Sequence, residues 1–238
     1  FSSGDLPLDV TFHGGDGGFD VLDLSGVSIG SYTPGAVFGD GVITAGSSTI
    51  NFTGLEPVYI DGATVTPAEG VDEPAGVVTT ALPNTFTFRT PGGADDLVID
   101  TPLMGWNRIK GTSSGVSFEE VHFTNIATVT LDLATHDMTG SDQDLVTISS
   151  DLVATGLEIL TINTGGGDDT VAVNASVAPA VAVIVNLGDG DDVYQFSAAA
   201  SSGSFILTET AETDGGTDTL DFSANTTGIT MDLSKVTE

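Results

Sequence analysis

Residues 164–196 read TGGGDDTVAVNASVAPAVAVIVNLGDGDDVYQF, and one pattern occurs twice within them. Each copy is a Gly/Asp segment, 165–169 or 188–192, with apolar residues at the second and fourth positions after its last Asp. These apolar residues are Val171, Val173, Tyr194 and Phe196. Alternation with a period of two is typical of a strand that buries one face. The stretch therefore predicts a unit of strand, acidic glycine turn and strand, which recurs after 23 residues.

The same unit is present on both sides of this stretch. Acidic residues followed by apolar residues at the second and fourth positions are Asp20, Asp95, Glu119, Asp144, Asp169, Asp192 and Asp218. From Asp95 onward they are separated by 24, 25, 25, 23 and 26 residues. Such a period, with short strands in each unit, is typical of a solenoid, whose units bury their apolar faces only by stacking. The sequence predicts an all-β fold, a parallel β-helix (β-solenoid) with rungs of about 24 residues and Gly/Asp corner turns.

We expect a single array over residues 1–238, with irregular rungs or loop excursions near 25–48, 61–84 and 101–116. The third excursion contains Trp106, which suits either a binding knob or, as the favoured reading, a cover over the edge of the core. No polar cap follows the last expected strand, and a solenoid without caps exposes open edges. We therefore expect a segment of a longer chain or fibre that self-associates or stacks on neighbouring solenoid segments.

Composition excludes several classes of partner. Hydrophobic residues make up 39% of the 238 residues, which is typical of a folded protein. Four Lys and Arg stand against 34 Asp and Glu, a net charge of −30, so nucleic acid is excluded as a partner. No apolar run approaches the ~20 residues of a membrane helix, so we expect no membrane insertion. The absence of Cys suits an extracellular protein that is reinforced by something other than disulfides.

The acidic turns are the candidate binding sites. If rungs lie ~4.8 Å apart, carboxylates at one corner repel one another by roughly 1 to 4 kcal/mol per pair, depending on the local dielectric. Calcium is the expected counter-ion, because it accepts carboxylates and turn carbonyls together, whereas Mg²⁺ demands a stricter octahedron and zinc lacks Cys or suitably spaced His ligands. The alternative is a metal-free turn, since Gly and Asp are good turn formers. The candidate metal ligands are Asp16, Asp20, Asp95, Asp142, Asp144, Asp168, Asp169, Asp189, Asp191, Asp192, Asp214 and Asp218.

Two of these turns resemble a known repeat. Residues 15–23, GDGGFDVLD, and 187–194, LGDGDDVY, resemble the RTX or hemolysin-type calcium-binding repeat G-G-x-G-x-D-x-U-x. The resemblance implies a secreted bacterial protein that binds Ca²⁺ in its glycine turns and folds outside the cell. The wider organisation is similar to that of the surface proteins and adhesins of aquatic bacteria. The chain departs from the repeat in its period, since RTX units recur every nine residues.

Three classes of function follow from these features. The favoured class is a non-enzymatic, extracellular structural or adhesive module, acting as a spacer, fibre or surface-layer unit. A polysaccharide-acting β-helix enzyme is an alternative, but the few basic residues and the absence of a carboxylate pair outside the repeat give no catalytic residues. The other alternative is a flat face for ice or glycans, carried by the outward threonines of 85–87, 128–130 and 161–163. We expect these threonines not to be aligned on consecutive rungs.

Overall fold

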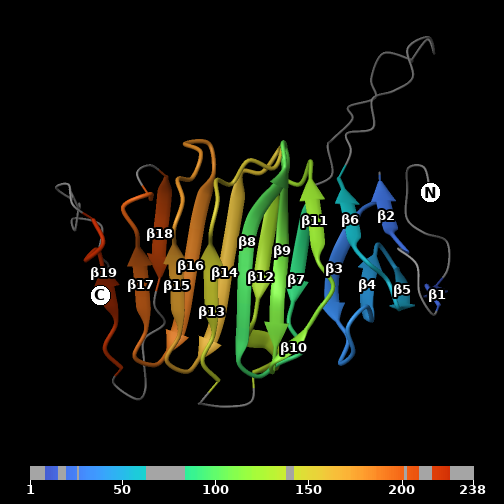
Figure 1. The fold of residues 1–238 in the computed structure, drawn as a ribbon, viewed down its shortest axis with the longest axis horizontal. Helices are drawn as coiled ribbons and strands as arrows, with labels where there is room; N and C mark the ends of the chain where they lie inside the picture. Colours follow the sequence, from blue (N-terminus) through green and yellow to red (C-terminus); the bar gives the residue numbers. More distant parts are fainter. Residues whose placement is uncertain are drawn as a thin grey trace, which may run out of the picture.

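The computed structural model describes residues 9–15, 20–25, 27–62, 84–137, 142–200, 203–208 and 216–225. They form an all-β structure of two mostly parallel sheets that do not close into a barrel. The strands of both sheets lie across the long axis of the molecule, from β1 and β2 at one end to β19 at the other (Figure 1). Within the described residues, no helix has the length and apolar character needed to cross a membrane.

The two sheets contain nine and ten strands. In spatial order the first sheet contains β1 (Val10–His13), β5 (Ser48–Thr53), β4 (Gly41–Ala45), β3 (Ile29–Pro34), β7 (Thr85–Arg89), β12 (Thr128–Asp132), β14 (Ile159–Gly166), β16 (Ala182–Asp189) and β18 (Ser204–Thr208). The second contains β19 (Thr219–Asp221), β17 (Val193–Phe196), β15 (Thr170–Val173), β13 (Leu145–Ile148), β8 (Asp95–Leu103), β9 (Trp106–Ser113), β11 (Val121–Thr124), β6 (Val58–Asp61) and β2 (Leu22–Ser25), and β10 (Val116–Ser117) pairs with β9. A 3₁₀ turn, η1 (Ala134–His136), follows β12.

From β12 onward the chain alternates between the sheets, one strand in each, and every pairing within a sheet is parallel. In the second sheet Leu145 pairs with Thr170, Thr170 with Val193 and Val193 with Thr219. These steps are the 25, 23 and 26 residues predicted from the acidic turns after Asp144. The spacing prediction is therefore confirmed for this part of the chain.

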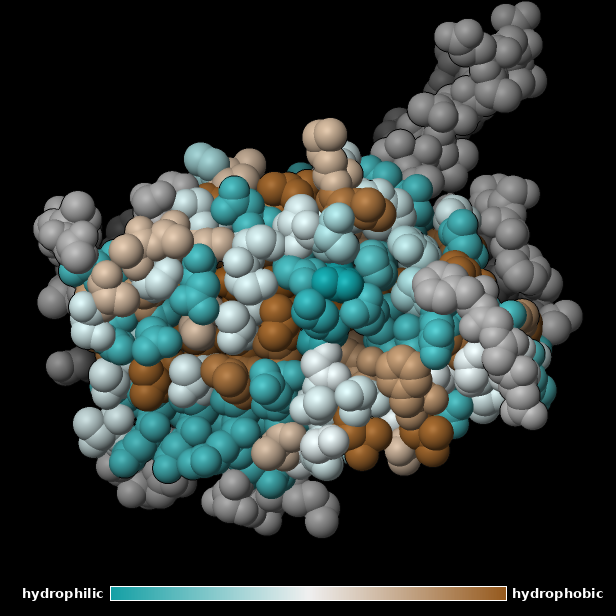
Figure 2. Space-filling model, viewed as in Figure 1, coloured by the Kyte–Doolittle hydropathy of each residue, from teal (hydrophilic) through white to brown (hydrophobic). Residues whose placement is uncertain are grey.

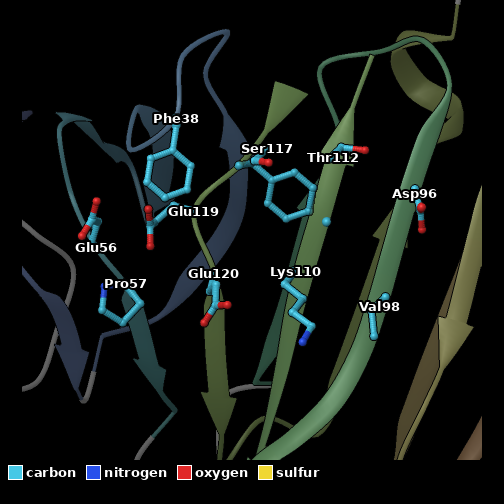
Figure 3. Close-up of a pocket in the computed structure, with 12 residues that line it drawn as sticks. Phe38, Glu56, Pro57, Asp96, Val98, Lys110, Thr112, Ser117, Glu119 and Glu120 are labelled. Carbon is cyan, nitrogen blue, oxygen red and sulfur yellow. The ribbon is translucent and has the colours of Figure 1, made fainter. Parts of the chain in front are cut away.

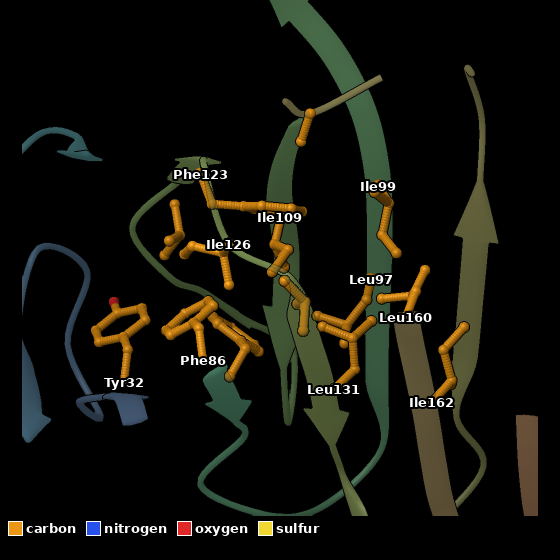
Figure 4. Close-up of a cluster of buried hydrophobic side chains, with 14 of the residues drawn as sticks. Tyr32, Phe86, Leu97, Ile99, Ile109, Phe123, Ile126, Leu131, Leu160 and Ile162 are labelled. Carbon is orange, nitrogen blue, oxygen red and sulfur yellow. The ribbon is translucent and has the colours of Figure 1, made fainter. Parts of the chain in front are cut away.

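The core lies between the sheets and consists of the alternate residues of each strand. Leu160 and Ile162 of β14 are fully buried, as is Leu131 of β12, while their neighbours in sequence face outward. Figure 4 shows these side chains pointing toward Leu97 and Ile99 of β8 from the opposite sheet. Full burial of one such side chain is worth about 1.5 to 3 kcal/mol, so the period-two pattern supplies the main stabilising term.

The prediction of a regular rung at Glu119 is wrong. Strand β13 pairs directly with β8, and the backbone amide of Asp95 reaches the carboxylate of Asp144, 49 residues further along the chain. Between them the chain turns back at Gly105 into the antiparallel strand β9, and β11 then pairs with β9 and β6. Strand β11 has the alternation of a rung, but the hairpin removes it from the column that contains Asp95.

The three expected excursions have different outcomes. Within 25–48, β3 pairs antiparallel with β4 and β4 with β5, so this stretch departs from the parallel pairing but is mostly strand. The second, 61–84, falls mainly on residues 63–83, outside the described part of the chain. The third, 101–116, also departs from the parallel pairing, and much of it is strand β9. Its Trp106 is half-buried and packs edge-on against Tyr59 at 5.7 Å.

Candidate cation site at the stacked acidic turns

The Asp residues at the start of the second-sheet strands form one continuous column, which is buried except for Asp218 at its end. The backbone amide of each Asp donates a hydrogen bond to Oδ1 of the Asp on the next strand. The donor–acceptor pairs are Asp95 to Asp144, Asp144 to Asp169 and Asp169 to Asp192, each 2.8 Å, and Asp192 to Asp218, 3.3 Å. The predicted stacking of these five residues is therefore present, and a ladder of amide–carboxylate bonds holds it.

Glycine is required in these turns because adjacent turns approach closely. A Cβ on Gly188 would lie 1.8 Å from the carbonyl oxygen of Gly165, and one on Gly190 would lie 1.9 Å from that of Gly167. Both residues also have positive φ angles, +100° and +149°, which side chains disfavour. The stacking itself accounts for the glycines, whether or not an ion is bound.

Part of the buried carboxylate surface is left without a partner. Oδ2 of Asp144, Oδ2 of Asp169 and both carboxylate oxygens of Asp137 are buried, and no residue that the structure describes donates a hydrogen bond to them. Burial raises the pKa of Asp144 to about 8, that of Asp137 to about 7 and that of Asp169 to about 6, and neighbouring carboxylates add to each effect. Buried acceptors without donors are costly and call for a proton or a cation.

The sequence analysis missed Asp137. This residue directly follows η1 and belongs to no repeat, so neither spacing nor alternation marks it. Its pKa is raised first by burial and then by the charges of Asp95, Asp142 and Asp169, which places it beside the column. A Cβ on Gly165 would lie 2.5 Å from Asp137 Oδ2, so the carboxylate sits against the Gly/Asp turn. Its one signal in the sequence is that of a lone acid a few residues after an expected strand.

The remaining candidates are more exposed or lie elsewhere. Asp168 and Asp191 form a second, outer ladder, in which Asp168 Oδ1 accepts the Asp191 amide at 3.1 Å and Asp191 Oδ1 accepts the Thr217 amide at 2.7 Å. Asp189 is exposed on its turn, and Asp142 is half-buried with its carbonyl against Gly167. Asp16 and Asp214 lie outside the described residues.

Asp20 belongs to a separate series. Leu22, Val58 and Val121 are in register on β2, β6 and β11. The residues two places before them, Asp20, Glu56 and Glu119, therefore occupy equivalent positions. Strand β9 lies between this series and β8, the strand that carries Asp95. The sequence predicts a single column of acids, but the structure has two, and Asp20 belongs to the N-terminal column.

The donor set of the main column matches a hard cation in chemistry. Carboxylate and carbonyl oxygens are the ligands that calcium prefers, and the described residues offer no other partner to both carboxylate oxygens of Asp137 and Oδ2 of Asp144 and Asp169. Across the described ranges, however, no three acidic or histidine side chains are placed so that they could hold one ion together. Carboxylates at the column would thus need turn carbonyls and water as further ligands.

The threonines on the outer face of the first sheet are arranged differently from the prediction. Thr85 lies beside Thr128, and Thr87, Thr130 and Thr161 form a row across β7, β12 and β14. The prediction that these threonines are not aligned on consecutive rungs is wrong, because the chain between β7 and β12 makes its excursion and returns in register.

No protein-family model, curated protein sequence or solved structure matches the chain.

Proposed function

We propose that the chain is an extracellular structural or adhesive module, a β-solenoid that calcium stiffens, acting as a spacer, fibre or surface-layer unit. The alternation of strands between two parallel sheets from β12 to β19 supports the solenoid. The single observation that carries the calcium proposal is the buried column beside Asp137, where carboxylates are stacked in register and several of their oxygens accept no hydrogen bond from the described part of the chain.

A divalent ion at this column would reduce the repulsion between its carboxylates. Burial and mutual repulsion disfavour the ionised forms of Asp137, Asp144 and Asp169, as their raised pKa values indicate. Two bound charges would offset that repulsion and join successive turns. At a concentration 100 times its dissociation constant, a ligand that binds only the folded state adds about 2.7 kcal/mol to the free energy of unfolding.

The test is unfolding of the whole chain by urea at pH 7.5, with calcium, with magnesium or with a chelator. We expect calcium to raise the free energy of unfolding by about 2 to 3 kcal/mol, and magnesium to raise it less. Asp137→Asn should remove most of the calcium increment, whereas Glu158→Gln, an exposed acid away from the column, should keep it. Identical unfolding in calcium and in chelator would rule the calcium proposal out.

A second candidate, a flat face for ice or neutral glycans, is favoured by the aligned threonines alone. Thr87, Thr130 and Thr161 repeat at the strand spacing of about 4.8 Å on three neighbouring strands. Thermal hysteresis and a glycan array test this candidate, with Thr130→Tyr as the disrupting variant and Thr147→Tyr on the other sheet as the control. Activity that is equal in both variants would exclude the face.

A further inference from the structure

A second acidic site lies in a pocket away from the Asp95 column. The pocket has a volume of about 580 Å³ and lies where the β8–β9 hairpin meets the turns that precede β6 and β11. Four of its residues have apolar side chains, Phe38, Pro57, Val98 and Phe118, and four are acids, Glu56, Asp96, Glu119 and Glu120. Figure 3 shows Glu119 between Glu56 and the ring of Phe38, with Glu120 and Lys110 further along the pocket.

Glu119 is the unusual member of this group. It is only 2% exposed, and its Oε2 accepts no hydrogen bond from the part of the chain that the structure describes. Its carboxylate accepts one hydrogen bond, from the backbone amide of Glu120. Burial raises its pKa to about 7, and the charges of Glu56 and Glu120 act in the same direction. A buried acceptor that lines a pocket is thus left to be satisfied by something outside the described chain.

The nearby basic side chains do not serve Glu119. Lys110, which also lines the pocket, has its Nζ 2.8 Å from Asp100 Oδ2. Arg108 binds both oxygens of Asp100, at 2.8 and 2.6 Å, and Oε2 of Glu120 at 2.7 Å. Figure 2 shows a hydrophilic patch over the middle of this face, where Figure 1 places β8 and β9. Glu119 and Glu56 therefore face the pocket without a cation from these two residues.

We propose that the pocket binds a small organic cation of the primary alkylammonium class, whose N–H group donates to Oε2 of Glu119 and whose hydrocarbon part packs against Phe118 and Pro57. Phe38, 45% exposed at the pocket, offers a ring face for a cation–π contact. A metal ion suits the pocket less well, because no three acidic or histidine side chains of the described residues are placed so that they could hold one ion together.

The proposal predicts that an N–H donor is required, and two probes of equal charge test this. Butylammonium and butyltrimethylammonium are titrated into the ¹⁵N-labelled whole chain at pH 8 and 150 mM salt, which screens the diffuse attraction of the −30 charge. Saturable amide shifts are expected at Phe38 and at 117–120. Butylammonium should bind about 10-fold more tightly than its trimethylated form, because a hydrogen bond to a charged group is worth about 1.5 to 3 kcal/mol. Butanol should not bind.

Three variants separate this pocket from general charge. Glu119→Gln should weaken butylammonium binding by about 10-fold or more, and Glu56→Gln, an exposed position that preserves the fold, should weaken it by a smaller factor. Glu158→Gln removes one charge elsewhere and should change nothing. If Glu119→Gln fails to fold, the proposal is tested by Glu56→Gln and by the comparison of the two probes.

Several outcomes would overturn the proposal. These are equal affinity for the two probes, shifts spread over the acidic turns, unchanged binding in Glu56→Gln, or displacement of butylammonium from the same amides by an equal concentration of calcium chloride. None of these outcomes bears on calcium at the Asp95 column, which the unfolding experiment with Asp137→Asn tests separately.

Discussion

Replacement of Gly188 by Ala tests whether close stacking of the turns holds the fold together. The φ angle of Gly188 is +100°, and a Cβ there would lie 1.8 Å from the carbonyl oxygen of Gly165. The backbone strain costs about 1 to 3 kcal/mol. Separating two packed turns adds about 1 to 3 kcal/mol, since the atom that the Cβ meets is backbone and cannot rotate away. We expect Gly188→Ala to lower the free energy of unfolding by about 2 to 6 kcal/mol.

Gly115→Ala is the matched control. Gly115 also has a positive φ angle, +76°, but a Cβ there would meet no atom within 4 Å. Only backbone strain should then lower the free energy of unfolding of Gly115→Ala, by about 1 to 2 kcal/mol. The stabilisation that Ala gives by restricting the unfolded chain is common to both variants. Urea unfolding of the two variants in the same buffer measures the difference, provided that the slope with denaturant is unchanged. Equal losses in Gly188→Ala and Gly115→Ala would refute the stacking explanation of the glycines.

Two further predictions concern charged groups. Burial raises the pKa of Asp144 from 3.8 to about 8. Between about pH 4 and 8 the folded state therefore keeps the proton on Asp144, while the unfolded state releases it. In the presence of a chelator, the free energy of unfolding should then fall as the pH rises through that range. Asp144→Asn should flatten this slope in urea unfolding from pH 5 to 8, whereas the exposed Asp151→Asn should keep it, and an unchanged slope in Asp144→Asn would contradict the assignment. Arg108→Lys loses the paired bonds to Asp100 and the bond to Glu120, so we expect a loss of about 1.5 to 3 kcal/mol. Arg89→Lys breaks a single bond to Asp132, from a more exposed arginine, and should cost less than about 1 kcal/mol. Equal decreases in melting temperature in the two variants would count against this ranking.

Much of the strand pattern can be predicted from this sequence, because where the chain alternates between two parallel sheets, the spacing along the chain equals the step between paired strands. Asp144, Asp169, Asp192 and Asp218 are spaced as their strands are paired. The same logic fails at Glu119, because an inserted antiparallel hairpin has the same period-two alternation as a rung. Spacing alone does not tell which neighbour a strand will pair with.

The candidate sites are less predictable than the strands. Asp137 lies beside the column through a 3₁₀ turn that no repeat marks. Glu119 lies in a different column from the one that its spacing predicts, and its surroundings include Phe38 and Glu56, which are far from it in sequence. The threonine row across β7, β12 and β14 also depends on an excursion that returns in register. Repeat spacing carries no information on such contacts.

The amide–carboxylate ladder has a direction. At every step the acceptor comes from a later part of the chain than the donor, from Asp95 and Asp144 to Asp192 and Asp218. The outer ladder runs the opposite way, because Asp168 accepts from Asp191 and Asp191 accepts from Thr217. Loss of one carboxylate from the inner ladder would therefore leave the amide of the preceding Asp without its acceptor, and would leave the amide of the following Asp paired.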